Sequence, residues 1–247
     1  MRLAMLMGVL LAGVCSAVGA KDAQPLTFTT TARVEVDADG KLVKVEAAQD
    51  LPEPVRAYVE RQIAQWKFAP NVREGVTGNA TTWVTLGACA LPQENGTYAM
   101  GIAFGGNGPR IAGGGKWRAP PDLFPIVVRS QIDGSADVNF IVHPDGTAKF
   151  ESMEGLSDGR LRRQMTPVFK RWIADYRFDP EEIGGAPVTT RATITLSFLS
   201  GSANNTSEKA MLARTMASPA CQRAGMPTVP GLNAIATDSV VSIVPTI

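Results

Sequence analysis

The sequence predicts an α+β fold made of two tandem copies of one small unit, each an antiparallel sheet covered by one helix. Three observations predict it: a repeated pentapeptide, a pair of hairpin patterns, and a helical pattern after each hairpin. The pentapeptide is an aromatic, a basic residue, Phe, any residue and Pro, and it occurs at 66–70 and 176–180. The chain has 247 residues, a length that fits one large domain or two small ones.

Each copy is expected to begin with a hairpin. Segments 32–47 and 137–152 both read as an alternating strand, an Asp-Gly turn and a second strand. The turns are at 39–40 and 145–146, where Gly supplies the positive φ of a tight hairpin at low steric cost.

A helix is expected to follow each hairpin. Apolar and aromatic residues recur there at helical spacing, namely Val55, Val59, Ile63 and Trp66 in the first copy and Met165, Phe169, Ile173 and Tyr176 in the second. Pro70 and Pro180 bias the preceding residues away from helical geometry, so each helix is expected to stop at the pentapeptide. The Thr-Pro pair 166–167 is typical of a cap and first turn, so the four residues before it are expected to form a separate turn.

An alternating strand is expected to close each copy, at 81–88 and at 191–198. The pentapeptide then has a structural role: its aromatic residue anchors the last helical turn, its Phe fills the core and its Pro ends the helix. Its basic residue, Lys67 or Arg177, suits a helix C-terminus because of the helix dipole.

The chain therefore divides into five segments. These are a signal peptide at 1–20, the first copy at 21–92, a flexible Gly-rich linker at 93–119, the second copy at 120–200 and a tail at 201–247. In the tail we expect a short helix at about 207–217. We also expect its apolar end, 239–247, to form a strand that packs on, or pairs with, one of the sheets.

The first 20 residues have the pattern of a secretory signal peptide. Arg2 precedes an apolar run, Leu3–Val14, and the small residues Val18–Ala20 form a cleavage site before Lys21. We expect a periplasmic protein with no stable membrane span after cleavage. A lipoprotein signal ending at Cys15 and an uncleaved anchor are the two alternatives.

Cleavage would leave two cysteines, Cys89 and Cys221. An oxidising compartment favours a disulfide between them, and two buried free thiols are the alternative. The bridge would close a loop of more than 100 residues. In the chain-entropy model such a loop contributes about 4–5 kcal/mol.

Sequence features of several function classes are missing. The chain has 24 basic and 23 acidic residues, which argues against a nucleic-acid face. His143 is the only histidine and precedes a turn, so a Ser-His-Asp set is not indicated. The cysteines lack metal-site spacing, and Trp117 stands where a phosphate-binding loop needs Ser or Thr. We predict no catalytic residue, cofactor or metal site.

The second copy resembles the TonB C-terminal domain family. Segment Pro120–Ala148 has that family's opening, with the Phe-Pro pair 124–125 and Gly134 at characteristic positions, and the later sequence YRFDP resembles its aromatic-basic-Phe-x-Pro motif. The resemblance covers Pro120–Gly201 well. It covers Ala32–Cys89 more loosely, because the Phe-Pro pair is missing there.

In that family the domain contacts outer-membrane transporters and pairs its exposed last strand with a partner peptide, which is β-augmentation. The resemblance implies a protein partner in the cell envelope, bound at the edge 191–199 with Thr193, Ile194 and Thr195 at its centre. The segment 81–86 is a second candidate edge. The alternative is that these edges pair with each other or with the tail.

The sequence thus predicts a non-enzymatic periplasmic binding protein. A transducer of the family needs a retained anchor and a Pro-rich spacer, so that role depends on an uncleaved N-terminal segment. An enzyme or small-ligand carrier is the main alternative, with Asp145, Glu151 and Glu154 as polar groups in a cleft between the copies. A structural envelope protein without a free edge is the third reading.

Overall fold

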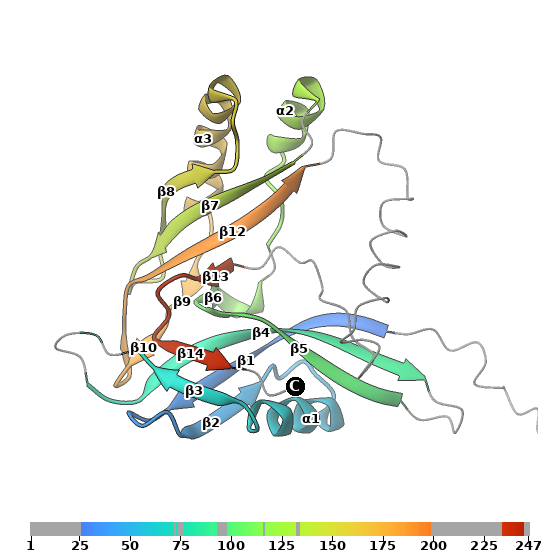
Figure 1. The fold of residues 1–247 in the computed structure, drawn as a ribbon, viewed down its shortest axis with the longest axis vertical. Helices are drawn as coiled ribbons and strands as arrows, with labels where there is room; N and C mark the ends of the chain where they lie inside the picture. The colour runs from blue at the N-terminus through green and yellow to red at the C-terminus, as the bar shows by residue number, and fades with distance from the viewer. Residues whose placement is uncertain are drawn as a thin grey trace, which may run out of the picture.

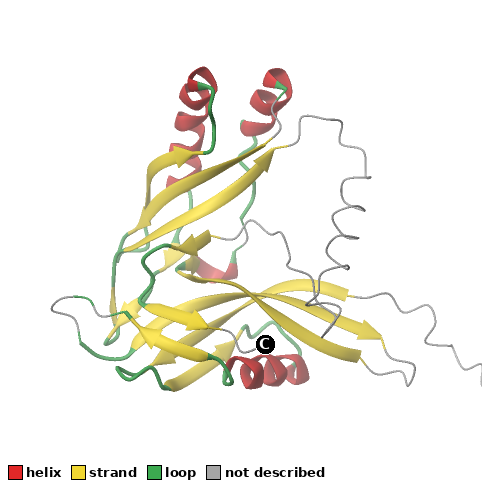
Figure 2. Ribbon diagram, in the orientation of Figure 1, coloured by secondary structure: helices red, strands yellow, loops and turns green. Residues whose placement is uncertain are grey.

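The fold is α+β, as the sequence predicts, with antiparallel sheets and helices in two copies of one unit (Figures 1 and 2). The computed structural model describes residues 26–71, 73, 77–92, 98–115, 117–131, 134–198 and 234–244. The predicted signal peptide, Cys221 and the predicted helix at 207–217 lie outside these residues. No helix among the described residues is both long and apolar enough to cross a membrane.

The first copy lies at the bottom of Figure 1 and follows the predicted order of strand, strand, helix and strand. Its elements are β1 (Leu26–Val36), β2 (Leu42–Ala47), α1 (Glu53–Ile63), β3 (Lys67–Pro70) and β4 (Ala80–Pro92). β1 pairs with β2 across the Asp-Gly turn and with β4 on its other side.

The second copy repeats this order at the top of Figure 1. Its elements are α2 (Leu123–Ser130), β7 (Gly134–Val142), β8 (Ala148–Glu154), α3 (Gly159–Ala174), β9 (Phe178–Asp179), β10 (Glu182–Ile183), β11 (Ala186–Pro187) and β12 (Thr190–Phe198). β7 lies between β8 and β12. β10 pairs with β4, so the second copy contributes to the sheet of the first.

The second long helix begins earlier than predicted. Asp158 caps α3, and its Oδ1 accepts hydrogen bonds from the N–H groups of Arg160 (2.7 Å) and Leu161 (3.3 Å). Pro167 lies inside the helix, and Thr166 donates its hydroxyl to the carbonyl of Arg162. The separate turn predicted before the Thr-Pro pair is wrong, because the Asp158 cap and the buried Leu161 extend the helix upstream.

The predicted flexible linker is also wrong. Residues Tyr98–Gly108 form a strand, β5, that pairs with β4 from Pro92 to Trp83. The apolar residues of β5 pack on the first core, where the rings of Phe104 and Trp66 meet edge to face with centroids 5.7 Å apart. β5 is followed by β6 (Arg110–Ile111), which pairs with β9, and by the short 3₁₀ helix Ala112–Gly114.

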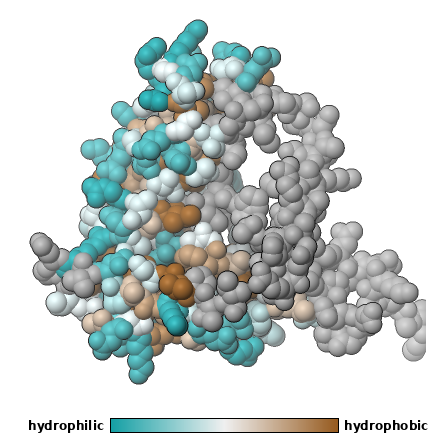
Figure 3. Space-filling view, viewed as in Figure 1, coloured by the Kyte–Doolittle hydropathy of each residue, from teal (hydrophilic) through white to brown (hydrophobic). Residues whose placement is uncertain are grey.

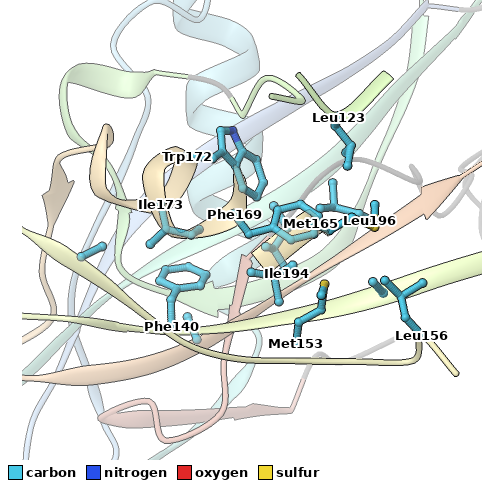
Figure 4. Close-up of a cluster of buried hydrophobic side chains, with 14 of the residues drawn as sticks. Leu123, Phe140, Met153, Leu156, Met165, Phe169, Trp172, Ile173, Ile194 and Leu196 are labelled. Carbon is cyan, nitrogen blue, oxygen red and sulfur yellow. The ribbon is translucent and has the colours of Figure 1, made fainter. Parts of the chain in front are cut away.

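Each copy has its own hydrophobic core. In the second copy α2 and α3 cover the sheet, and Phe140, Phe169 and Ile194 are fully buried between them (Figure 4). The first core is completed by the tail, because Val240 and Val241 are fully buried in it. The predicted C-terminal strand is confirmed as β14 (Val241–Val244), which pairs with β3.

The repeated pentapeptide has the same surroundings in both copies. Phe68 pairs with Ile243 of β14, and Phe178 pairs with Ile111 of β6. The Gly of each Asp-Gly turn packs on the carbonyl of that Phe; a Cβ added at Gly146 would lie 2.5 Å from the Phe178 oxygen. The motif therefore holds the hairpin turn and an added strand. This role is structural, but it differs from the predicted one, because both helices end before the motif begins.

Candidate functional site

The predicted partner edge is partly covered by the chain itself. One side of β12 pairs with β7 along all nine residues. On its other side β13 (Ala234–Ala236) pairs with Ala192, Thr193 and Ile194. The prediction of an exposed edge is therefore wrong at Thr193 and Ile194, where the tail occupies the edge. In the described part of the chain, no strand pairs with that side of Thr195.

The second candidate edge is wrong throughout. β4 is an interior strand, with β1 on one side and both β10 and β5 on the other. β5 takes this edge because it follows β4 directly as the second arm of a long hairpin.

β13 lies in a slot that both copies build. One wall is the β12 edge, Ala192–Ile194, and the floor is formed by Gly106 and Gly108 of β5. A Cβ at Gly108 would lie 2.6 Å from the Ala236 Cβ, and one at Gly106 would lie 2.9 Å from Cγ1 of Ile235. Only glycine allows β5 to approach β13 this closely. We call Ala192–Ile194, Gly106 and Gly108 the strand slot.

The backbone of β12 alternates in direction along the slot. The Thr237 N–H donates to the Arg191 carbonyl at 2.9 Å, so the backbone groups of Arg191 point toward the tail. Because these groups alternate in an antiparallel pair, those of Thr193, Thr195 and Ser197 also point outward. The outward backbone edge of β12 therefore extends beyond the part that the described residues of β13 cover.

A buried acid fixes the tail next to the slot. Glu181 is fully buried, and its Oε1 accepts hydrogen bonds from the hydroxyls of Thr82 (2.5 Å) and Ser239 (2.6 Å). Its Oε2 accepts from the Thr190 hydroxyl (2.9 Å) and from the Val240 N–H (3.3 Å). These partners come from the first copy, the second copy and the tail, so one carboxyl group joins all three.

Burial raises the pKa of Glu181, and the three hydroxyls and the Val240 N–H offset part of that rise. Asn107 of β5 extends the network, since its amide donates to the Ser239 hydroxyl and to the Val241 carbonyl, both at 2.7 Å. Every acceptor position of the carboxyl group is directed at a structural partner. The arrangement therefore acts as a clamp between segments.

Arginines hold the tail from the outside. Arg73 donates to the carbonyls of Thr189 and Asp238. Arg191 lies 3.6 Å from the Asp238 carboxylate, whose other oxygen accepts from the Arg191 N–H at 2.6 Å. These contacts fix the tail immediately after β13.

The three carboxylates proposed for a cleft do not form one site. Asp145 accepts hydrogen bonds from the hydroxyl and the N–H of Thr147, and the hydroxyl is the main cause of its lowered pKa. Glu151 lies 3.5 Å from Arg191, and Glu154 accepts from the Asn139 amide at 3.3 Å. The three carboxylates lie along β8 and the turn before it, and each contacts a different residue. Within the described ranges, no three His, Cys, Asp or Glu residues are placed to hold a metal ion.

Cys89 is fully buried in β4 and is disulfide-bonded. Its predicted partner, Cys221, lies outside the described residues, so the predicted pairing stays a prediction.

Sequence reasoning predicted Thr193 and Ile194 on the β12 wall of the slot but missed the glycine floor and Glu181. Gly106 and Gly108 lie in a Gly-rich segment that was interpreted as a linker, although glycines at alternate positions are also typical of a strand that another backbone approaches closely. Glu181 follows the pentapeptide directly and carries no pattern of its own. Comparisons with models of known families, with curated proteins and with solved structures found no match.

Proposed function

We propose that this chain is a non-enzymatic binding module of the bacterial cell envelope, and that it takes an extended segment of a partner protein onto the outer edge of β12. The observation that supports this most strongly is the strand slot, where the same edge already holds an antiparallel strand. The edge continues through Thr195–Phe198, which stays in regular register with β7. A partner strand would find further outward backbone groups there.

Two other outer strands, β8 and β2, are protected against strand addition. β8 carries a bulge opposite Asn139 and Phe140, with exposed Lys149 and Glu151. β2 likewise carries a bulge, opposite Glu35 and Val36, and exposed charged side chains. Bulges and charges are the usual means of blocking an edge. The segment Thr195–Phe198 has an uninterrupted register and no charged residue, which favours it as the binding edge.

The cellular compartment is proposed on two grounds. The disulfide at Cys89 fits an oxidising compartment. The N-terminal pattern is that of a secretory signal peptide, and the resemblance of the second copy to the TonB C-terminal domain family suggests an outer-membrane transport protein as the partner.

The proposal can be tested by crosslinking in cells. A photoreactive amino acid at Thr195 should give a discrete crosslinked partner, and the same group at Lys149 on β8 should not. Ser197→Pro should reduce the crosslink by about fivefold or more, because it removes one outward N–H donor from the edge. Ser197→Ala keeps that donor and should leave the crosslink unchanged.

Two results would overturn the proposal. One is an equal yield from Thr195 and Lys149, which would indicate nonspecific proximity. The other is a Thr195 crosslink that the Ser197→Pro variant forms as well as the Ser197→Ala variant does.

A further inference from the structure

We infer that the strand slot is a peptide-binding site that β13 closes in cis, and that a partner segment with an aliphatic residue followed by a small one replaces β13 there. This inference rests on the proposed function, because it names the class of segment that the β12 edge takes. Three features of the slot carry it: the weak hold on β13, the independent anchoring of the tail, and the glycine floor.

β13 is weakly held. It has three residues and pairs with three of the nine residues of β12. Each backbone hydrogen bond contributes only a small net free energy, because its release exchanges it for a bond to water. Ile235 is 48% exposed, and in Figure 3 a hydrophobic patch interrupts the hydrophilic front surface where β13 lies. Little buried surface therefore opposes the release of β13.

The tail is anchored without β13. The bonds of Ser239 and Val240 to Glu181 and the pairing of β14 with β3 all lie after β13 in the chain. β13 can thus leave the slot while the tail continues to complete the first core. A strand can leave its site without unfolding the protein only if the neighbouring segment is anchored by other contacts, as the tail is here.

The glycine floor selects the side chains of the occupant. The Cβ of Ala236 packs on Gly108, where even an added Cβ would lie 2.6 Å away, so we expect a bulky side chain in place of Ala236 to collide with β5. The branched side chain of Ile235 covers Gly106 and supplies apolar contact. A replacing segment therefore needs a small residue opposite Ala192, and an aliphatic residue before it, opposite Thr193.

A partner segment can pair over a longer stretch than β13 does. In the register of β13 and β12, the residues facing Ser197 and Phe198 would be Gly231 and Pro230 of the chain itself. Both residue types are poor strand formers, and Pro has no N–H to donate. A partner with ordinary strand residues at these places can pair with β12 there more favourably than Gly and Pro can.

The test uses the full chain and a labelled peptide. The probe is TVLNAIATD, which is residues 230–238 with Pro230→Thr and Gly231→Val. Ile235→Pro in the chain removes a donor that faces β12 and should empty the slot. This variant should bind the probe at least about tenfold more tightly than the wild-type chain, whose slot is occupied. The same peptide carrying Ala236→Trp is the control and should not bind.

A second variant and a second readout keep the test decisive. Ala236→Trp in the chain should also expel β13 and raise probe affinity. In the wild-type chain, saturating probe should accelerate hydrogen exchange of the Ile235 amide. The inference is wrong if the exchange rate does not change, if the Ala236→Trp peptide binds as well as the probe, or if the chain forms dimers by exchanging β13 between copies.

The two proposals can fail separately. A probe that binds in the slot, together with no crosslink from Thr195 in cells, would support the slot and overturn the proposed function. A specific Thr195 crosslink without probe binding would support the proposed function and overturn the slot.

Discussion

Glu181 is the residue that most constrains the junction of the two copies. A fully buried carboxyl group costs free energy unless its oxygens are bonded, and here three hydroxyls and one backbone N–H bond it. No charged side chain is among the causes of its pKa shift, so no ion pair counters the desolvation. Burial therefore dominates, and the folded state holds the proton more tightly than the unfolded chain does.

The sign of the pH dependence follows from this shift. Because the pKa of Glu181 is raised on folding, its contribution to stability is fully present below about pH 4.3, the usual value, and is lost as pH rises through the folded pKa. Glu181→Gln has no such titration. The unfolding free energy of the wild type should thus fall relative to that of Glu181→Gln as pH rises from about 4, measured by urea unfolding of both chains.

The wild type and Glu181→Gln share all other carboxylates, so the contributions of those groups to the pH dependence cancel in the difference. Asp145, with its lowered pKa, contributes in the opposite direction in both chains alike. A difference between the two chains that grows in favour of the wild type with rising pH would contradict the prediction.

The elements that repeat locally could be predicted from the sequence, and those that depend on distant partners could not. Hairpin turns and helical faces follow from short-range periodicity, so β1, β2, α1, β7 and β8 were predicted. β5 was missed because its glycines dominate its composition, although Ile102 and Phe104 keep the alternation that packs on the first core. The site was predicted to be the last strand of the second copy, and the covering of its edge by β13 has no local signal.

The C-terminal strand should stabilise the first copy although it lies at the far end of the sequence. Ending the chain after Ala236 removes Val240 and Val241 from the first core. Burying one such side chain contributes about 1.5–3 kcal/mol, so the truncation should cost about 3 kcal/mol or more. The matched control ends after Val244, keeps β14 and should retain the full-length denaturant midpoint. Equal midpoints for both truncations would show that β14 does not stabilise the chain.

Strand pairings between segments that are far apart in the sequence join the two copies and the tail. β10 of the second copy pairs with β4 of the first, and β14 of the tail pairs with β3. Sequence periodicity reports which face of a segment is buried but not which strand lies beside it. It therefore predicted a C-terminal strand against one of the sheets, but not that β3 is its partner, and it gave no sign of the pairing of β10 with β4. The result is that neither copy has its full set of partners within its own segment of the chain.

The proposed compartment makes a prediction about the whole chain. Intact mass of the protein from its own envelope should correspond to a chain starting at Lys21. Reduction should add the mass of two hydrogen atoms, because one disulfide opens. A chain that keeps Met1 would contradict the cleaved form and favour an anchored protein instead.

The burial of Val240 and Val241 in the first core has a consequence for the order in which the protein can be made. The first core includes Val240 and Val241, so it cannot be fully packed until these two residues have been synthesised. The first copy therefore depends on contacts of high sequence separation, which slow folding and leave part of its core open until β14 is in place.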